Sequence, residues 1–105
     1  MYLPDKYKKF ASQFPEIFEL YNELGARVRD SGPLDANTRN LVKLGIAVGS
    51  NSRGAVMSHT RKALETGSKK EEIRHAILLA LSTTGFPNMI AALTWADEVL
   101  EKERA

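Results

Sequence analysis

Helix-breaking residues divide this chain into segments of helical length, and this spacing constrains the fold more than any other feature. The clearest breaks are the clusters at residues 30–33, 49–52 and 85–87. Between them, apolar residues recur every three or four positions, as they do on one face of an α-helix. No window shows the β-branched alternation that is typical of a strand. The pattern therefore predicts an all-α protein.

The spacing predicts five to six helices, which should pack as antiparallel hairpins because their connections are short. The predicted helices span residues 5–13, 16–28, 36–48, 53–66 and 69–84, with a last helix that starts at 85–87 and runs to about Glu103. A chain of this length suits one hydrophobic core. We therefore expect a single domain over residues 1–105.

Polar residues and glycines at the segment ends fit helix caps. Asp35 is the expected N-cap of the third helix, and Ser52 or Asn51 that of the fourth. Gly67 is expected to end the fourth helix, since glycine readily adopts the left-handed conformation found there. Residues 68–71, Ser-Lys-Lys-Glu, match a capping box that would open the fifth helix at residue 69.

The third predicted helix is apolar on almost every side. Its large apolar residues are Leu41, Val42, Leu44, Ile46 and Val48. Such a helix must be covered on most sides, by its own domain or by a partner subunit. Gly45, inside the same helix, suggests that another helix approaches it closely. We therefore expect a homo-oligomer.

Composition and charge exclude several classes of function. The absence of cysteine excludes disulfides, thiolate metal sites, thiol nucleophiles and dithiol redox chemistry. Residues 1–50 carry seven basic and six acidic residues, and residues 51–105 carry eight and seven, so neither half is strongly basic. A nucleic-acid partner is therefore not expected. No apolar run could cross a bilayer, and the first residues lack the apolar core of a signal peptide. We expect no membrane partner and a soluble, cytoplasmic protein.

The two histidines are the candidate acid–base groups. His75 lies among charged residues, which favours a position at the surface or at the rim of a site. His59 lies in the middle of a predicted helix, where it is either a hydrogen-bonded structural histidine or a functional group. Neither has a second histidine one helical turn away, and no glycine-rich phosphate loop is present. We therefore expect no metal site and no cofactor.

Two motifs identify a family. His59-Thr-Arg-Lys-Ala-Leu-Glu-Thr-Gly67 is followed by Glu-Glu-Ile73, and Thr84-Gly-Phe-Pro87 precedes the last helix. With residues 38–52, these motifs resemble the carboxymuconolactone decarboxylase family, which includes the alkylhydroperoxidase-like proteins. The resemblance covers about residues 15–100. It implies the alkylhydroperoxidase-like helical fold and a trimer or a hexamer.

The redox branch of this family uses a glutamate and a histidine to activate a pair of cysteines, which then reduces a peroxide. The resemblance places these four positions at Asn40, Ser52, Ala55 and His59. Only the histidine matches the pattern. Serine forms an alkoxide far less readily than cysteine forms a thiolate, and alanine carries no thiol at all. The protein is therefore not expected to be a dithiol peroxidase.

The decarboxylase branch implies another role for the same residues. Its substrate resembles a carboxylated lactone, and His59 would move a proton as carbon dioxide leaves. Asn40 and Ser52 would be polar partners, with Asn40 orienting the imidazole by a hydrogen bond where the family often has a carboxylate. Arg39 or Arg61 would bind the carboxylates of the substrate, unless they are surface residues.

The sequence leaves three functions open. The first is a decarboxylase-like lyase with His59 as its acid–base group. The second is a catalytically inactive family member that acts as a small-ligand-binding or structural homo-oligomer, which the missing glutamate and cysteines favour. The third is a nucleic-acid-binding protein with a basic face.

Overall fold

The computed structural model describes residues 5–102, and every regular element within them is helical. The elements are α1 (Asp5–Gln13), α2 (Pro15–Arg29), α3 (Ala36–Gly49), α4 (Arg53–Glu65), α5 (Lys70–Leu78), the 3₁₀-helix η1 (Leu79–Ser82) and α6 (Phe86–Lys102). The all-α prediction is confirmed. The predicted end of the last helix at Glu103 lies outside the described residues.

Contacts divide the chain into two compact units that separate at Pro33 and Leu34. The N-terminal unit contains α1 and α2, and the C-terminal unit contains α3 to α6 with η1. That residues 1–105 form a single domain stays a prediction.

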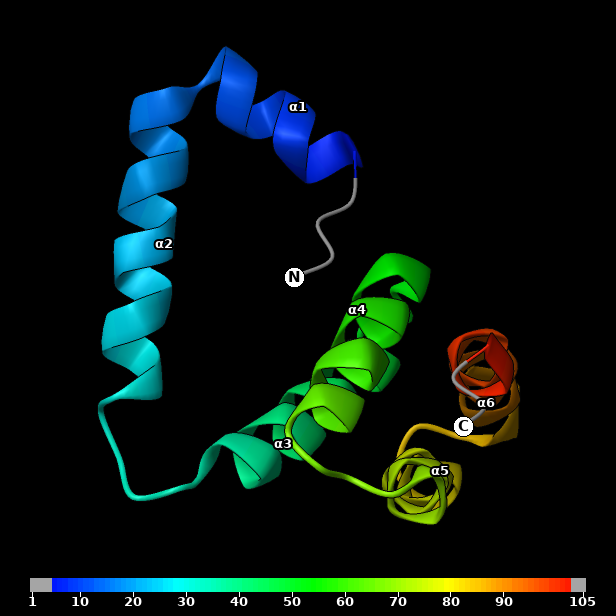
Figure 1. Cartoon of the computed structure of the whole chain (residues 1–105). Helices are drawn as coiled ribbons and strands as arrows, with labels where there is room; N and C mark the ends of the chain where they lie inside the picture. Colours follow the sequence, from blue (N-terminus) through cyan, green and yellow to red (C-terminus); the bar gives the residue numbers. More distant parts are fainter. Residues whose placement is uncertain (1–4, 103–105) are drawn as a thin grey trace. The chain divides into compact units, whose positions relative to one another are not determined.

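In the N-terminal unit, a bend separates α1 from α2 (Figure 1). Aromatic rings near the bend contribute to the contact between the two helices. The ring of Phe10 lies 5.7 Å from that of Phe14 and 6.1 Å from that of Phe18, measured between ring centroids. Pro15 begins α2, where its missing N–H has no helical partner to lose. None of the described residues in α1 or α2 is buried.

One face of α2 is apolar and exposed. It carries the predicted helical repeat of large apolar residues, each between 55% and 65% exposed. We call this face the α2 stripe, and its residues are Ile17, Leu20, Tyr21, Leu24 and Val28. Two helices with no buried residue lack the packed core from which most helical stability comes.

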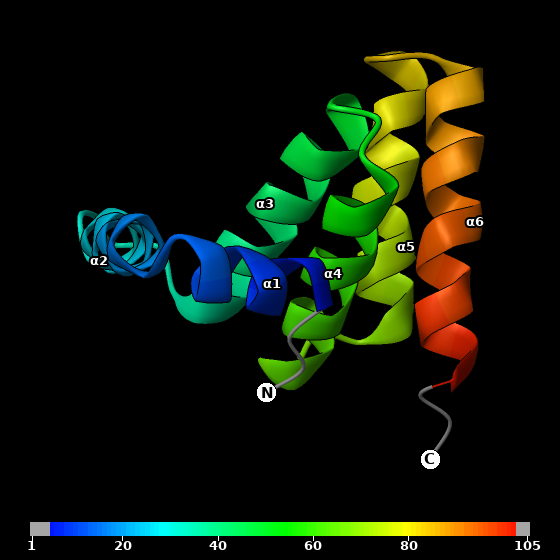
Figure 2. The same ribbon diagram turned by 90° about the horizontal axis from the view of Figure 1, so that it is seen from above.

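The C-terminal unit has a hydrophobic core to which α3, α4, α5 and α6 all contribute. Figure 2 shows α5 and α6 lengthwise and running in opposite directions, with α3 and α4 forming a second antiparallel pair. The core residues are Leu44, Ala47, Val48, Val56, Ala63, Ile73, Ile77, Met89, Ala92, Ala96 and Leu100. Antiparallel packing of neighbouring helices is therefore confirmed in this unit.

Capping residues place the starts of α3 and α4 as predicted, whereas α3 ends one residue later than predicted and α4 one residue earlier. The Asp35 carboxylate accepts a hydrogen bond of 2.8 Å from the Thr38 N–H, which also lowers the pKa of Asp35. The Ser52 hydroxyl accepts one from the Ala55 N–H. Gly67 adopts a φ of 100° after α4, a conformation that strains any residue with a side chain.

The turn between α3 and α4 is held by a residue of α6. Asn51 in this turn has a φ of 53°. The Asn88 amide donates hydrogen bonds to the Val48 carbonyl at 2.7 Å and to Asn51 Oδ1 at 3.3 Å. The Oδ1 atom of the same Asn88 side chain accepts a hydrogen bond from the Thr84 hydroxyl. Asn88 therefore joins the α3–α4 turn to the start of α6.

The start of α5 differs from the prediction. The N-cap is Lys69 rather than Ser68, and the Glu72 carboxylate, instead of Glu71, accepts the Lys69 N–H at 2.7 Å. The Ser68 hydroxyl is buried and donates to Asn37 Oδ1 of α3. Because Ser68 is engaged across the fold, it does not cap its own helix, and α5 begins one residue later than expected.

The helix predicted over residues 69–84 also ends early. α5 stops at Leu78 and η1 follows. A 3₁₀-helix has three residues per turn instead of 3.6, so the positions after Leu78 no longer follow the α-helical repeat. Ile73 and Ile77 are buried, whereas Leu81 and Thr84, which an α-helix continued to residue 84 would place on the same face, are exposed.

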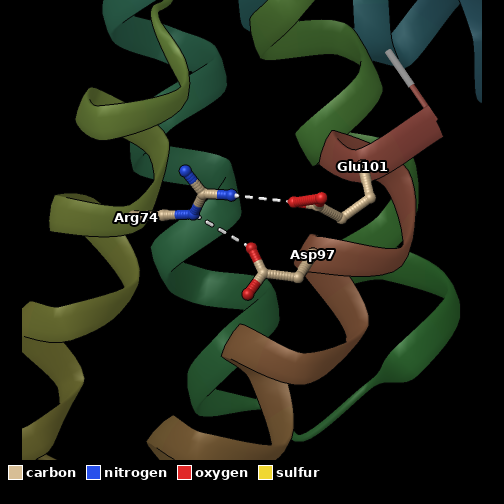
Figure 3. A network of polar contacts seen from close by, with 3 residues as sticks. All are labelled: Arg74, Asp97 and Glu101. Carbon is tan, nitrogen blue, oxygen red and sulfur yellow. Dashed lines mark hydrogen bonds and ion pairs between the residues drawn. The ribbon is translucent and has the colours of Figure 1, made fainter. Parts of the chain in front are cut away.

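An ion-pair network joins α5 to α6 (Figure 3). Arg74 Nε lies 3.0 Å from Asp97 Oδ1, and Arg74 Nη2 lies 3.6 Å from Glu101 Oε1. All three side chains are 39–56% exposed, so solvent screens these interactions. The network orients two helices that are already packed by apolar residues.

Among residues 5–102, none of the helices has both the length and the apolar character needed to cross a bilayer.

We predict that Asn88→Ala lowers the free energy of unfolding by about 1–2 kcal/mol, because it removes partly buried hydrogen bonds at the α3–α4 turn. Arg74→Met, which removes the exposed network, should cost less than about 1 kcal/mol. Urea denaturation at one fixed protein concentration measures both values. Equal losses would show that Asn88 does not hold the turn.

Candidate functional site

The candidate site lies where α3 packs against α4, and His59 is its central residue. His59 is half-buried on α4. Its Nδ1 atom is fully buried and has no hydrogen-bond partner among the described residues. A buried polar atom without a partner costs free energy, so such atoms are rare in folded proteins. This nitrogen is therefore free to bind a group that the chain itself does not supply.

The surroundings of His59 keep its imidazole neutral. Burial lowers its pKa to about 4, and the positive charges of Lys62 and Lys43 contribute to the decrease. Both effects disfavour the charged imidazolium. At neutral pH, His59 therefore has a lone pair available on one ring nitrogen, and two cationic side chains lie near enough to act on it.

Asn40 lies on α3 and faces α4, but its side chain binds the end of that helix rather than His59 Nδ1. Asn40 Nδ2 donates to the Lys62 carbonyl at 3.2 Å and to the Thr66 hydroxyl at 3.1 Å. The bonded carbonyl belongs to the last turn of α4, one turn beyond His59. The structure therefore gives Asn40 a role in fastening α3 to α4.

Ser52 and Ala55 lie at the start of α4. Ser52 is the N-cap, and its hydroxyl oxygen accepts the Ala55 N–H at 3.3 Å. Seven residues separate Ser52 from His59, which is two helical turns, about 10 Å along the helix and nearly the same face. One side of α4 therefore carries Ser52 and, two turns later, His59. The Lys62 carbonyl that Asn40 binds follows in the next turn.

The two predicted arginines do not lie on this side of α4. Arg39 Nη1 donates to the Leu34 carbonyl at 2.5 Å, just before α3. Arg61 follows His59 by two residues, which turns it by about 200° around the axis of α4. Their role in binding a substrate carboxylate stays a prediction.

Sequence reasoning missed the two lysines that act on His59. Lys43 is three residues after Asn40, and Lys62 is three residues after His59. Residues three apart lie on the same side of a helix, so this spacing could have placed both lysines at the α3–α4 contact. The burial of His59 had no comparable signal, because it depends on how closely two helices approach.

An apolar groove of about 550 Å³ lies on the other side of α3, between α3, α5 and η1. We call it the α3–α5 groove. Its lining is Thr38, Leu41, Val42, Gly45, Gly49, Glu72, His75, Ala76, Leu79, Ala80, Thr83 and Thr84. His59 is not among these residues, whereas His75 is exposed at this groove.

Gly45 borders this groove, and no helix of the same chain approaches it closely, so the expected close approach of another helix stays a prediction for a partner chain. A Cβ atom added there would meet no heavy atom within 4 Å. The neighbouring Val42 and Ile46 are 48% and 64% exposed. This side of α3, which was expected to be covered, is therefore open in the single chain.

The described residues contain no group of three or more His, Asp or Glu side chains that could hold a metal ion.

A comparison with known families explains the helical arrangement. The sequence pattern of the carboxymuconolactone decarboxylase family matches residues 15–98. The chain belongs to this family. The match includes the whole α3–α4 contact and His59.

Two proteins from different organisms are similar to this chain in sequence. An uncharacterized protein of Methanocaldococcus jannaschii is 29% identical over 96 residues, which is 90% of this chain and 88% of the relative. An uncharacterized protein of Haemophilus influenzae is 31% identical over 55 residues, about half of each chain.

Solved structures show the same fold. A carboxymuconolactone decarboxylase family protein from Legionella pneumophila, solved without ligand, has a TM-score of 0.80 and 21% identity, and the match covers 93% of this chain and 87% of that one. A candidate carboxymuconolactone decarboxylase from Burkholderia xenovorans has a TM-score of 0.73 and 23% identity, over 98% and 86% of the two chains. The predicted alkylhydroperoxidase-like family fold is confirmed, in a member that lacks cysteine.

We predict that His59 makes the protein less stable in mild acid. In the unfolded chain, histidine binds a proton near pH 6.5, whereas folded His59 binds one only near pH 4. The free energy of unfolding should therefore decrease as the pH falls from about 6.5 to 4, by about 2 kcal/mol after allowance for partial solvent exposure.

Urea denaturation of His59→Asn across this pH range tests the prediction. The decrease should be smaller in this variant by about the same 2 kcal/mol. Parallel curves for the original protein and His59→Asn would contradict the lowered pKa of His59.

Proposed function

We propose that the α3–α4 contact binds a small carboxylated metabolite, and that His59 is the acid–base group of a decarboxylase-like lyase acting on a carboxylated lactone or a related acid. One observation carries this proposal. His59 has a buried, unpartnered Nδ1, and two lysines act electrostatically on the same ring. A neutral imidazole next to two cations suits a ligand that carries negative charge and exchanges a proton.

Binding of an anion would change the protonation of His59. The charges of Lys43 and Lys62 lower its pKa, and a bound carboxylate offsets these charges. The pKa of His59 should therefore rise when the ligand binds, towards the range in which imidazole exchanges protons at neutral pH. The acid–base group would become active only in the complex.

The reaction would proceed as follows. The bond between the ring carbon and its carboxylate breaks, carbon dioxide leaves, and the electron pair of that bond passes into the unsaturated lactone. A proton then has to be added to carbon, and protonated His59 delivers it. The lysines stabilise the negative charge that develops on the lactone oxygen. Overall, the reaction consumes one substrate carboxylate and one proton, and it forms one C–H bond and one molecule of carbon dioxide.

A second candidate function is small-ligand binding without catalysis, in a family member that has lost turnover and serves as a binding or structural homo-oligomer. The position of Asn40 favours it. The Asn40 amide donates to the Lys62 carbonyl and the Thr66 hydroxyl, and within residues 5–102 no carboxylate or other group holds Nδ1 of His59 in one orientation. A histidine without an orienting partner is a weaker catalyst than one held by a hydrogen bond.

We predict that carboxylated lactones shift the titration of His59, observed by proton NMR of its imidazole ring. In the free protein the ring should titrate near pH 4, and a binding lactone should raise this value. Lys43→Met should raise the pKa in the free protein and weaken binding about fivefold, whereas Lys102→Met at the end of α6 removes a charge without either effect.

Turnover separates the two candidate functions. Release of carbon dioxide that His59→Asn abolishes and Lys102→Met leaves unchanged would support the lyase. Binding that shifts the His59 titration without release of carbon dioxide would support the non-catalytic member. If no carboxylated lactone or related acid shifts the titration, the proposed ligand class is wrong.

A further inference from the structure

The α2 stripe is an apolar surface without a described partner of matching size. Its five large side chains repeat at helical spacing, and each is more than half exposed. Neither α1 nor α2 has a buried residue among those described. An amphipathic helix of this kind is stabilised mainly by what its apolar face packs against.

The α3–α5 groove is a second uncovered apolar surface. α3 lines one side of it and α5 with η1 the other, and several of the lining residues are small. They are Gly45, Gly49, Ala76 and Ala80. A Cβ atom added at Gly45 would meet only open space, Leu79 in the lining is 60% exposed, and Ile46, which follows Gly45 in the sequence, is 64% exposed.

The charges of the two surfaces also match. Glu72 and His75 are the only ionisable residues in the lining of the α3–α5 groove. An occupant must therefore present a face that is almost entirely apolar. The α2 stripe contains no ionisable residue except the Tyr21 phenol, and among the charged residues of α2, Arg27 lies at its edge, seven residues after Leu20.

We propose that the α2 stripe of one copy of the chain lies in the α3–α5 groove of a second copy. This is helix-in-groove recognition, in which residues one turn apart anchor an amphipathic helix between two others. The proposal assigns a partner to both surfaces. It does not depend on the proposed function, because His59 lies outside the groove lining.

The exposed area is comparable with that of the smaller specific interfaces. The five side chains of the stripe are each more than half exposed and bring about 500 Å² in total, at about 100 Å² each. A reciprocal pair, in which each copy supplies one helix and one groove, buries about 1,000 Å² from the two stripes alone, and the groove walls add to this area.

Single cysteines test the contact, because the chain has none of its own. Leu24→Cys places a thiol on the α2 stripe, and Val42→Cys places one in the groove. Glu19→Cys is the matched control, since Glu19 is about 200° around α2 from Ile17. Each variant has one thiol, so a disulfide between two variants joins two chains. A size tag on one variant identifies the mixed product.

The proposal expects three results. The unaltered chain has the mass of two or more chains in light scattering at micromolar concentration. Co-expressed Leu24→Cys and Val42→Cys chains form the mixed disulfide under mild oxidation. Glu19→Cys with Val42→Cys gives at least tenfold less of it.

Several results would overturn the proposal. One is a single-chain mass for the unaltered protein, which does not depend on any variant. Another is a Val42→Cys homodimer without the mixed product, because then two grooves face each other. Equal crosslinking by Glu19→Cys and Leu24→Cys would also overturn it, since the stripe would then have no preference for the groove.

Discussion

The packing of α3 against α4 is the interaction on which the rest of the C-terminal unit depends. Leu44 and Ala47 on one helix and Val56 and Ala63 on the other belong to the same buried core. Asn40 and Asn88 add hydrogen bonds at the two ends of this contact. The same close approach desolvates His59, so the chemistry of the candidate site follows from how the core is packed.

Local signals in the sequence were sufficient for most of the fold. Asp35, Ser52 and Gly67 act at helix ends through contacts with their own neighbours, which a sequence shows directly. The prediction failed at Ser68 because its hydroxyl binds Asn37 of α3, which is 31 residues away. The change to a 3₁₀-helix after Leu78 likewise has no local signal that we recognise. The predicted members of the site were found on the expected helices, but the burial of His59 and the approach of Lys43 depend on tertiary packing.

The chain belongs to the family, but three of its residues at the expected site positions have structural roles. The family pattern matches the whole α3–α4 contact, yet Ser52 and Ala55 now serve the start of a helix, and Asn40 fastens α3 to α4. Each of these residues contributes to the fold at a position where the resemblance to the redox branch implies a reactive group. His59 differs from them, since its buried nitrogen makes no contribution to the fold that the structure reveals.

Two opposite faces of α3 make different contacts, and this restricts how the helix can change in evolution. Asn40 and Lys43 lie towards α4, whereas Val42, Gly45 and Gly49 line the groove on the opposite side. A substitution can alter one face without the other. An insertion or deletion inside the helix alters both faces, because one inserted residue rotates all following side chains by about 100° around the helix axis. Insertions and deletions should therefore be confined to the loops at either end of α3, while the number of residues from Asn40 to Gly49 stays constant.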